Sequence, residues 1–294
     1  MQLESDDENY PRSSSLLSLN YHPDFSSPDA NVVLAAKDAK VYFRIHSHTL
    51  KTVSGFFRTM YSLPQSKVTF ADIMYLDEDA EILERLFSMV CGLPFHDIES
   101  HDLLESLLFA AEKYDMPGPM SILRMSLLTP ALDSDPIRLY SSATRYNWKR
   151  EGSILSNRTL PLNIHDKKHQ NALRTLSTDA LLDLITLHRD RREGLKECLD
   201  SPPFVSGDPS RCIQCETPIN YTTWRELKHR IITEMDQRPL GDTILDIGLC
   251  TWPEAAACWR AACSNEGCKR LLYDRSETMR VIRECIEKLP KTIN

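Results

Sequence analysis

The sequence predicts an α+β domain followed by an all-helical C-terminal region. Residues 32–45 contain short β-branched and alternating apolar stretches, which are typical of strands. From residue 48 the apolar residues recur at helical spacing, and this pattern returns in three further segments up to residue 128. From Pro136 onward the helical spacing continues without another strand pattern. Strands followed by amphipathic helices within about 100 residues indicate a small α+β domain, and the remainder indicates helices.

A β-hairpin is predicted where folding begins. Residues 32–34 form a β-branched run, residues 37–40 form a polar turn, and residues 41–45 alternate. Because side chains alternate between the two faces of a strand, Phe43 and Ile45 are expected to face the core together. A short third strand is expected at residues 67–70.

Four amphipathic helices are expected after the hairpin. The first runs from residue 48 and ends before Pro64, where proline interrupts the backbone pattern. The second follows an acidic first turn and ends at Gly92. The third begins near Ser100, and the fourth covers about residues 119–128.

The 294 residues suffice for about two domains, and composition divides them further. Residues 1–28 are acidic and serine-rich and are expected to form a disordered tail. We expect the α+β domain at residues 29–128 and a helical extension at residues 129–200. A proline-rich break then precedes a helical module, rich in cysteine and tryptophan, at residues 201–294.

Charge and hydropathy exclude several classes of partner. The net charge is −7, and no basic stripe is present of the kind that releases phosphate counterions, so nucleic-acid binding is disfavoured. The arginines at positions 189, 191 and 192 alternate with acids and are interpreted as a solvated helix face. No apolar run approaches the roughly 20 residues of a membrane span, and the N-terminus lacks the features of a secretory signal. We therefore expect an intracellular protein, cytoplasmic or nuclear, without a membrane partner.

The junction between the second strand and the first helix carries a spaced motif. His46 ends the strand, and Leu50, Ser54, Phe57 and Met60 follow it by 4, 8, 11 and 14 residues. This spacing resembles the signature of BTB/POZ domains. The resemblance implies that His46 is a buried core histidine and that all five residues shape the fold or the interface without doing chemistry.

Two later segments extend the resemblance. Residues 110–116, Ala-Ala-Glu-Lys-Tyr-Asp-Met, are similar to a helix of the same fold, and residues 135–148 are similar to the segment after the domain in a large fungal group of BTB proteins. The family implies protein–protein interaction and self-association as a homodimer. Asn31 replaces the Asp that the family usually places at the head of its first strand, which removes a charge near the dimer interface. Residues 63–65, Leu-Pro-Gln, lack the glutamate by which many members recruit cullins.

The cysteines carry the other chemical signal. Six lie between residues 212 and 268, among nine in the chain, and the odd total disfavours a disulfide framework in an intracellular protein. Cys212 and Cys215 have two residues between them, and Cys263 and Cys268 have four. Four thiolates about 2.3 Å from one Zn²⁺ form a closed structural site, which would join the two ends of the intervening 47-residue segment. Free thiols and a redox pair remain open alternatives. Cys258 is an alternative ligand, but the segment around it is expected to be a helix, which would point its side chain away from the other cysteines.

Enzymatic activity is not expected. His46 and His48 could share a strand face as metal ligands, but the fold assignment explains them better, and His165 and His169 are interpreted as part of a solvated loop. Hydrolase, metalloprotease and phosphate-loop motifs are missing from the sequence. The sequence therefore predicts a non-catalytic adaptor or scaffold acting through a BTB/POZ domain. A substrate adaptor of a cullin-type ubiquitin ligase and a metal- or redox-sensing regulator are the alternatives.

Overall fold

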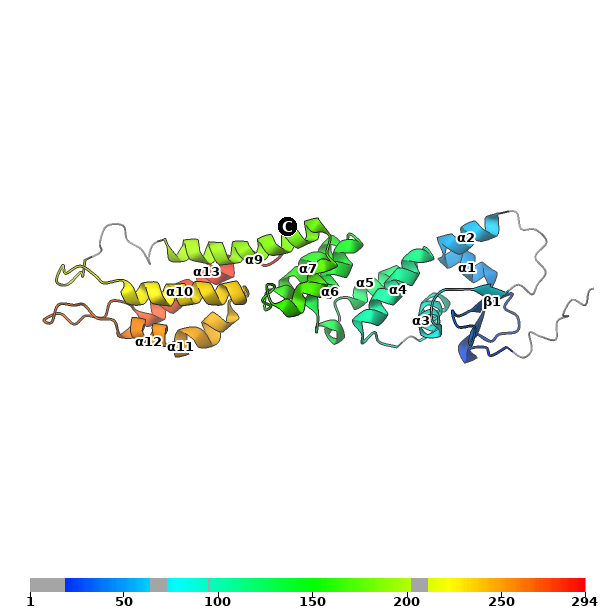
Figure 1. Ribbon diagram of the computed structural model, residues 1–294, viewed down its shortest axis with the longest axis horizontal. Helices are drawn as coiled ribbons and strands as arrows, with labels where there is room; N and C mark the ends of the chain where they lie inside the picture. Colours follow the sequence, from blue (N-terminus) through cyan, green and yellow to red (C-terminus); the bar gives the residue numbers. More distant parts are fainter. Residues whose placement is uncertain (1–18, 64–72, 95, 202–210, 294) are drawn as a thin grey trace, which may run out of the picture. The chain divides into compact units, whose positions relative to one another are not determined.

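The computed structural model describes residues 19–63, 73–94, 96–201 and 211–293 (Figure 1). The chain forms two compact units, Met1–Asp133 and Ser134–Asn294. The first unit combines a small sheet with helices, and the described part of the second is dominated by helices. The predicted fold class, an α+β domain followed by a helical region, is confirmed.

The sheet of the first unit has three described strands in the order β2-β1-β3. The predicted hairpin is confirmed, because β1 (Val32–Ala35) pairs antiparallel with β2 (Tyr42–Ile45), and Leu34 lies opposite Phe43. The third described strand is β3 (Ile73–Tyr75), which pairs parallel with β1. The strand predicted at residues 67–70 lies outside the described residues.

The helices of the first unit follow the predicted apolar pattern, with one difference. The pattern from residue 48 to Pro64 predicts one helix, but the structure has two, because Ser54 is extended and its hydroxyl accepts a hydrogen bond from Phe57 N at 3.1 Å. A serine in this position starts a new helix instead of continuing the first. The helices are α1 (Ser47–Val53), α2 (Gly55–Ser62), α3 (Ala80–Cys91), α4 (His101–Lys113) and α5 (Pro117–Ser126), with short 3₁₀ turns at Pro23–Phe25 and Pro130–Leu132.

The two sequence motifs of this unit meet in its core. The Ser54 hydroxyl donates to the carbonyl of Tyr114 at 2.5 Å, and Gly55 N donates to the carbonyl of Asp115 at 2.9 Å. The rings of Phe57 and Tyr114 stack with centroids 5.7 Å apart, and Phe57 is fully buried. The motif residues therefore join the start of α2 to the end of α4, which explains their spacing as a requirement of the fold.

His46 is the exception, because its side chain is exposed and not buried as predicted. Ile45 faces the core, so its neighbour along the strand points to the opposite side. The backbone carbonyl of His46 accepts from Leu50 N at 3.2 Å, but its imidazole makes no capping bond to α1. This residue marks the start of α1 without supporting the core.

The segment just before β1 is packed against the unit, although we assigned residues 1–28 to a disordered tail. Tyr21 pairs with Tyr42 at the edge of β2, and His22 N donates to the Tyr42 carbonyl at 2.8 Å. Phe25 is buried and its ring lies 5.6 Å from that of Phe43. Aromatic side chains stabilise this segment despite its polar composition, while residues 1–18 lie outside the described part.

Asn31 has a structural role at the start of α1. Its amide oxygen accepts from Ser47 N at 2.8 Å, and its amide nitrogen donates to the Ser47 hydroxyl at 2.9 Å. Both bonds are between neutral groups, so this corner carries no charge from Asn31.

The second unit is built from helices that run from α6 to α13. Buried side chains of α9, α10, α12 and α13 form one hydrophobic cluster around Trp224, Leu227 and Ile231. Figure 1 shows α9, α10 and α13 lying alongside one another. The helices are α6 (Pro136–Arg145), α7 (Lys149–Thr159), α8 (Gln170–Arg174), α9 (Thr178–Leu199), α10 (Thr222–Gln237), α11 (Leu249–Thr251), α12 (Pro253–Arg260) and α13 (Arg275–Lys288), with a 3₁₀ turn at Lys167–His169 and a π-turn at Ile244–Gly248.

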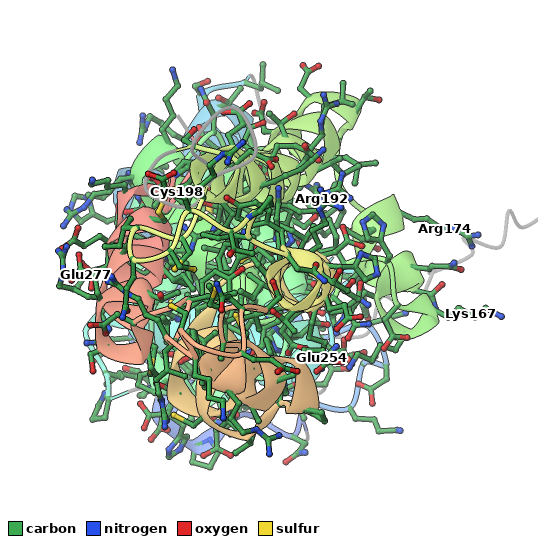
Figure 2. All side chains as sticks on the ribbon, turned by 90° about the vertical axis from the view of Figure 1, so that its left-hand side faces the viewer. Lys167, Arg174, Arg192, Cys198, Glu254 and Glu277 are labelled. Carbon is green, nitrogen blue, oxygen red and sulfur yellow. A yellow bond between two sulfur atoms is a disulfide. The ribbon has the colours of Figure 1, made fainter. Side chains whose placement is uncertain are left out.

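The solvated loop expected around His165 and His169 is confirmed only in part. His165 is exposed, and the charged side chains of Lys167 and of Arg174 in α8 point away from the unit (Figure 2). His169 is half-buried, and its Nε2 atom is buried. None of the described helices has the length and apolar character needed to cross a bilayer.

Arg191 on α9 is buried, so the expected solvated arginine face is wrong at this position. Its side chain is 2% exposed and donates to backbone carbonyls, at 2.6 Å to Pro239, 2.6 Å to Pro290 and 3.1 Å to Leu240. The acceptors come from a turn and from the chain end, which a local charge pattern does not reveal. The guanidinium therefore ties three segments of the unit together.

Cys198 of α9 and Cys285 of α13 form a disulfide, whereas the odd cysteine count led us to expect no disulfides. Their Cα atoms lie 6.2 Å apart, because the two helices pack in the same hydrophobic cluster (Cys198 is labelled in Figure 2). Pairing of residues 87 positions apart depends on helix packing and leaves no signal in cysteine spacing.

Candidate metal centre

Two β-hairpin loops of the second unit carry the predicted cysteines. Cys212 and Cys215 lie in a loop that is closed by the Arg211–Pro218 bridge, where Cys212 N donates to the Thr217 carbonyl at 2.9 Å. The second loop repeats this pattern. Cys263 and Cys268 lie between Ala262 and Leu271, which form an antiparallel bridge, and Cys263 N donates to the Arg270 carbonyl at 2.8 Å.

The residue after the second cysteine is left-handed in both loops. Glu216 has φ 58° and Lys269 has φ 48°. This conformation costs free energy for any residue with a Cβ atom and is usually taken by glycine. Two equivalent positions adopt it here, so the loops share one turn geometry. Glutamate and lysine give no sequence signal of such a turn, and our sequence reasoning missed both residues.

The loops bring the four predicted cysteines together. The Sγ atoms of Cys212 and Cys268 lie 3.7 Å apart, and those of Cys215 and Cys263 lie 3.4 Å apart. All four Sγ atoms lie within 4.8 Å of one another. Thiolates that surround Zn²⁺ at about 2.3 Å in a tetrahedron are separated by about 3.8 Å. The arrangement therefore has the size and donor set of a closed zinc site.

Backbone amides face the sulfur atoms. The amide of Gln214 hydrogen-bonds to Cys212, and the amide of Thr217 to Cys215. In the second loop the amides of Asn265 and Arg270 hydrogen-bond to Cys263 and Cys268. Each donor lies two residues after its cysteine. Such bonds favour the charged thiolate, which is the form that binds metal.

The four thiols differ in acidity. Hydrogen bonds with the side chain and backbone of Thr217 lower the pKa of Cys215 to about 6. The Asn265 amide also lowers the pKa of Cys263, but burial and the neighbouring Cys215 and Cys212 outweigh it and raise that pKa to about 11. Crowded thiolates repel one another, so they do not all ionise together in the absence of a cation. A divalent cation offsets part of this repulsion, because its charge balances two of the four thiolates.

Other cysteines and histidines lie outside the cluster. Cys258 is fully buried on α12 in the hydrophobic cluster, where burial raises the pKa of its thiol to about 12. Cys91 and Cys250 are exposed. In the described part of the chain, the four clustered cysteines are the one group of three or more metal-ligating side chains close enough to share an ion. The histidine pairs considered from the sequence do not join it.

Comparison with known families identifies the first unit. Residues 24–130 match the family model of the BTB/POZ domain. BTB/POZ domains are protein-interaction modules that often dimerise and are generally non-enzymatic. Comparison with curated proteins finds no match.

Proposed function

Because residues 24–130 form a BTB/POZ domain, we propose that the chain is a non-catalytic adaptor acting inside the cell, in the cytoplasm or nucleus. The domain associates with a second copy or with a partner protein, and the helical unit presents a second surface. The family match is the observation that carries this proposal.

Self-association is tested by size-exclusion chromatography with light scattering on the full chain. The chain mass is 33.7 kDa, so a homodimer has a mass of about 67 kDa, twice that value. A dimer interface on the order of 2,000 Å² would persist at micromolar concentration. A mass of one chain at that concentration contradicts the homodimer. Binding to a purified cullin, followed in the same experiment, favours the ubiquitin-ligase alternative.

We also propose that Cys212, Cys215, Cys263 and Cys268 hold one structural zinc ion. Sulfur separations of 3.4 and 3.7 Å and the backbone amides aimed at the thiolates support this assignment. A bound zinc supplies no open coordination position in a four-thiolate site, so its role is to join the two loops.

Metal analysis of the purified full chain tests the zinc proposal. We expect one zinc per chain, which Cys212→Ser abolishes. Cys250→Ser is the matched control, because Cys250 is an exposed cysteine outside the cluster, and it should keep the metal. Loss of zinc in Cys258→Ser, with retention in Cys268→Ser, would contradict the ligand set. Metal-free protein with a Cys215 thiolate that alkylates readily at neutral pH would instead favour a redox sensor.

A further inference from the structure

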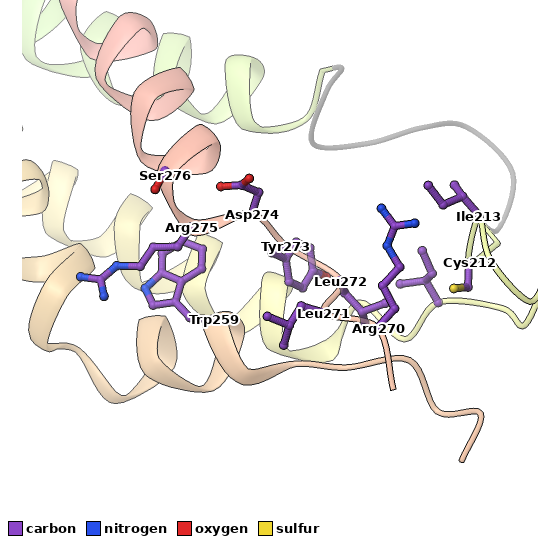
Figure 3. Close-up of a pocket in the computed structure, with 11 residues that line it drawn as sticks. Cys212, Ile213, Trp259, Arg270, Leu271, Leu272, Tyr273, Asp274, Arg275 and Ser276 are labelled. Carbon is purple, nitrogen blue, oxygen red and sulfur yellow. The ribbon is translucent and has the colours of Figure 1, made fainter. Parts of the chain in front are cut away.

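A groove of about 820 Å³ runs beside the two cysteine loops (Figure 3). One side is formed by Ile213 at the tip of the first loop, and the floor by the segment that leaves the second loop. Trp259 and Arg275 line the other end. Its volume is within the range of sites that bind small molecules and peptide side chains.

The floor of the groove is the segment of residues 271–273, which joins the rest of its hairpin through a single antiparallel bridge. Leu271 lies opposite Ala262 in an antiparallel bridge, and the bonds on either side join Leu272 N to the Ala261 carbonyl at 2.9 Å and Cys263 N to the Arg270 carbonyl at 2.8 Å. In such a pair the backbone groups of the intervening residue point away from the partner. The N–H groups of Leu271 and Tyr273 have no acceptor among the described residues. An exposed edge of this kind accepts an added strand.

Apolar side chains border this edge. Ile213 is 81% exposed and Leu271 is 59% exposed, although both are large aliphatic residues. They lie on different loops and line the same groove. A partner that covers them gains roughly 25 cal/mol for each Å² of apolar surface removed from water.

Two arginines line the groove, Arg270 and Arg275, and neither forms an ion pair with a carboxylate among the described residues. Arg275 donates to Cys250 Sγ at 3.5 Å. Elsewhere in the unit Arg192, Arg230, Arg238 and Arg280 all pair with carboxylates. Asp274 also lines the groove, but its carboxylate accepts from Glu277 N at 3.0 Å as the cap of α13. Arg270 extends toward the side of the groove where Ile213 lies (Figure 3).

We propose that this groove binds an extended acidic segment of a partner protein by strand addition. The partner's backbone pairs with Leu271 and Tyr273, an apolar side chain covers Ile213 and Leu271, and a carboxylate pairs with Arg270. The free backbone N–H groups give main-chain affinity, and the arginines that lack a carboxylate partner favour acidic sequences. The inference goes beyond the adaptor proposal, because it assigns the second surface and the chemistry of the segment that docks there.

Selection from a phage-displayed library of random twelve-residue peptides tests it, with the zinc-loaded full chain as the target. Enriched peptides should combine an excess of Asp and Glu with β-branched or aromatic residues. Synthetic copies are then titrated by fluorescence anisotropy. Arg270→Glu should weaken their binding at least tenfold, and Ile213→Ser at least threefold. Lys288→Glu is the matched control, because Lys288 is an exposed cation at the other end of α13, and it should change the affinity less than twofold.

Backbone methylation separates strand addition from simple charge attraction. N-methylation of alternate residues of a bound peptide should abolish binding in one register and leave the other within threefold. Four outcomes would each overturn the proposal. The selection enriches no peptide, or it enriches peptides that are neutral or basic. Arg270→Glu leaves the affinity unchanged, or methylation has equal effects in both registers. Zinc content and circular dichroism confirm that each variant is folded. The mass of the full chain by light scattering is a separate measurement, so failure here leaves the adaptor proposal standing.

Discussion

Arg191 offers the sharpest test of how the helical unit is held together. The substitution Arg191→Met keeps the apolar stem of the side chain and removes the guanidinium. It leaves four carbonyls without this donor. The bonds to Pro239, Leu240 and Pro290 are 3.1 Å or shorter, and the bond to Leu289 is 3.4 Å. Each buried acceptor left unsatisfied costs about 1–3 kcal/mol. Removing a buried charge, whose pKa is lowered by desolvation, recovers several kcal/mol. We therefore expect a net loss of about 3 kcal/mol in the free energy of unfolding.

Tryptophan fluorescence in urea measures this loss selectively. All four tryptophans, at positions 148, 224, 252 and 259, lie in the second unit, so their emission follows that unit alone. Arg189→Met is the matched control, because Arg189 is exposed on the same helix, and it should change stability by less than about 0.5 kcal/mol. A loss below about 1 kcal/mol in Arg191→Met, with an unchanged denaturant slope, would refute the idea that this arginine joins the three segments.

Three further substitutions probe other parts of the structure. Burial lowers the pKa of His188 to about 4 from its usual 6.5, so between these pH values the unfolded chain binds a proton that the folded unit does not. The free energy of unfolding should therefore fall by up to about 3 kcal/mol as the pH drops from 6.5 to 4. The variant His188→Gln should lack this part of the pH dependence, which tryptophan fluorescence measures. Glu216→Gly should stabilise the second unit by about 1 kcal/mol in urea titrations, because glycine adopts the positive φ of this position without strain. Glu266→Gly is the control in the other loop, where the φ is not positive, and should not stabilise the unit. Equal effects of the two substitutions would contradict a left-handed turn at Glu216. Ser54→Ala should lower the free energy of unfolding of the first unit by about 2 kcal/mol in calorimetry, since it removes a helix cap and the bond to the Tyr114 carbonyl. Ser62 is exposed, so Ser62→Ala is the control, and an equal loss of stability in both variants would argue against the role of Ser54.

The elements predicted from the sequence are those whose signals are local. Alternation identified the β1–β2 hairpin, and helical spacing identified most helices of the first unit, because each pattern reflects one face of one element. The break at Ser54 escaped because apolar spacing continues across it. The burial of Arg191 was not predicted because its acceptors lie 48 to 99 residues away in the sequence. The exposure of His46 was not predicted because a family pattern fixes the position of a residue in the sequence without fixing its burial.

The candidate site shows the same division. Spacing alone pointed to Cys212, Cys215, Cys263 and Cys268, since short intervals between thiols constrain where their sulfur atoms can go. Spacing did not reveal that the two pairs sit on matching hairpins, because the left-handed residues after the second cysteines are not glycine. It also did not reveal the groove, which requires the second hairpin to leave one edge unpaired.

The hydrophobic cluster and the cysteine loops stabilise different parts of the second unit. Buried side chains of α9, α10, α12 and α13 form a continuous cluster that includes Cys258, but the four clustered cysteines are not members of it. The helices can therefore bury their apolar faces without a metal, unlike a small zinc finger that is unfolded without its ion. The loops have little apolar contact of their own, and Ile213 and Leu271 are exposed. A zinc ion bound here would therefore mainly order the two hairpins and the groove between Ile213 and Leu271. Under the docking proposal, removing the metal should weaken binding of a partner segment in this groove more than it lowers the stability of the helices.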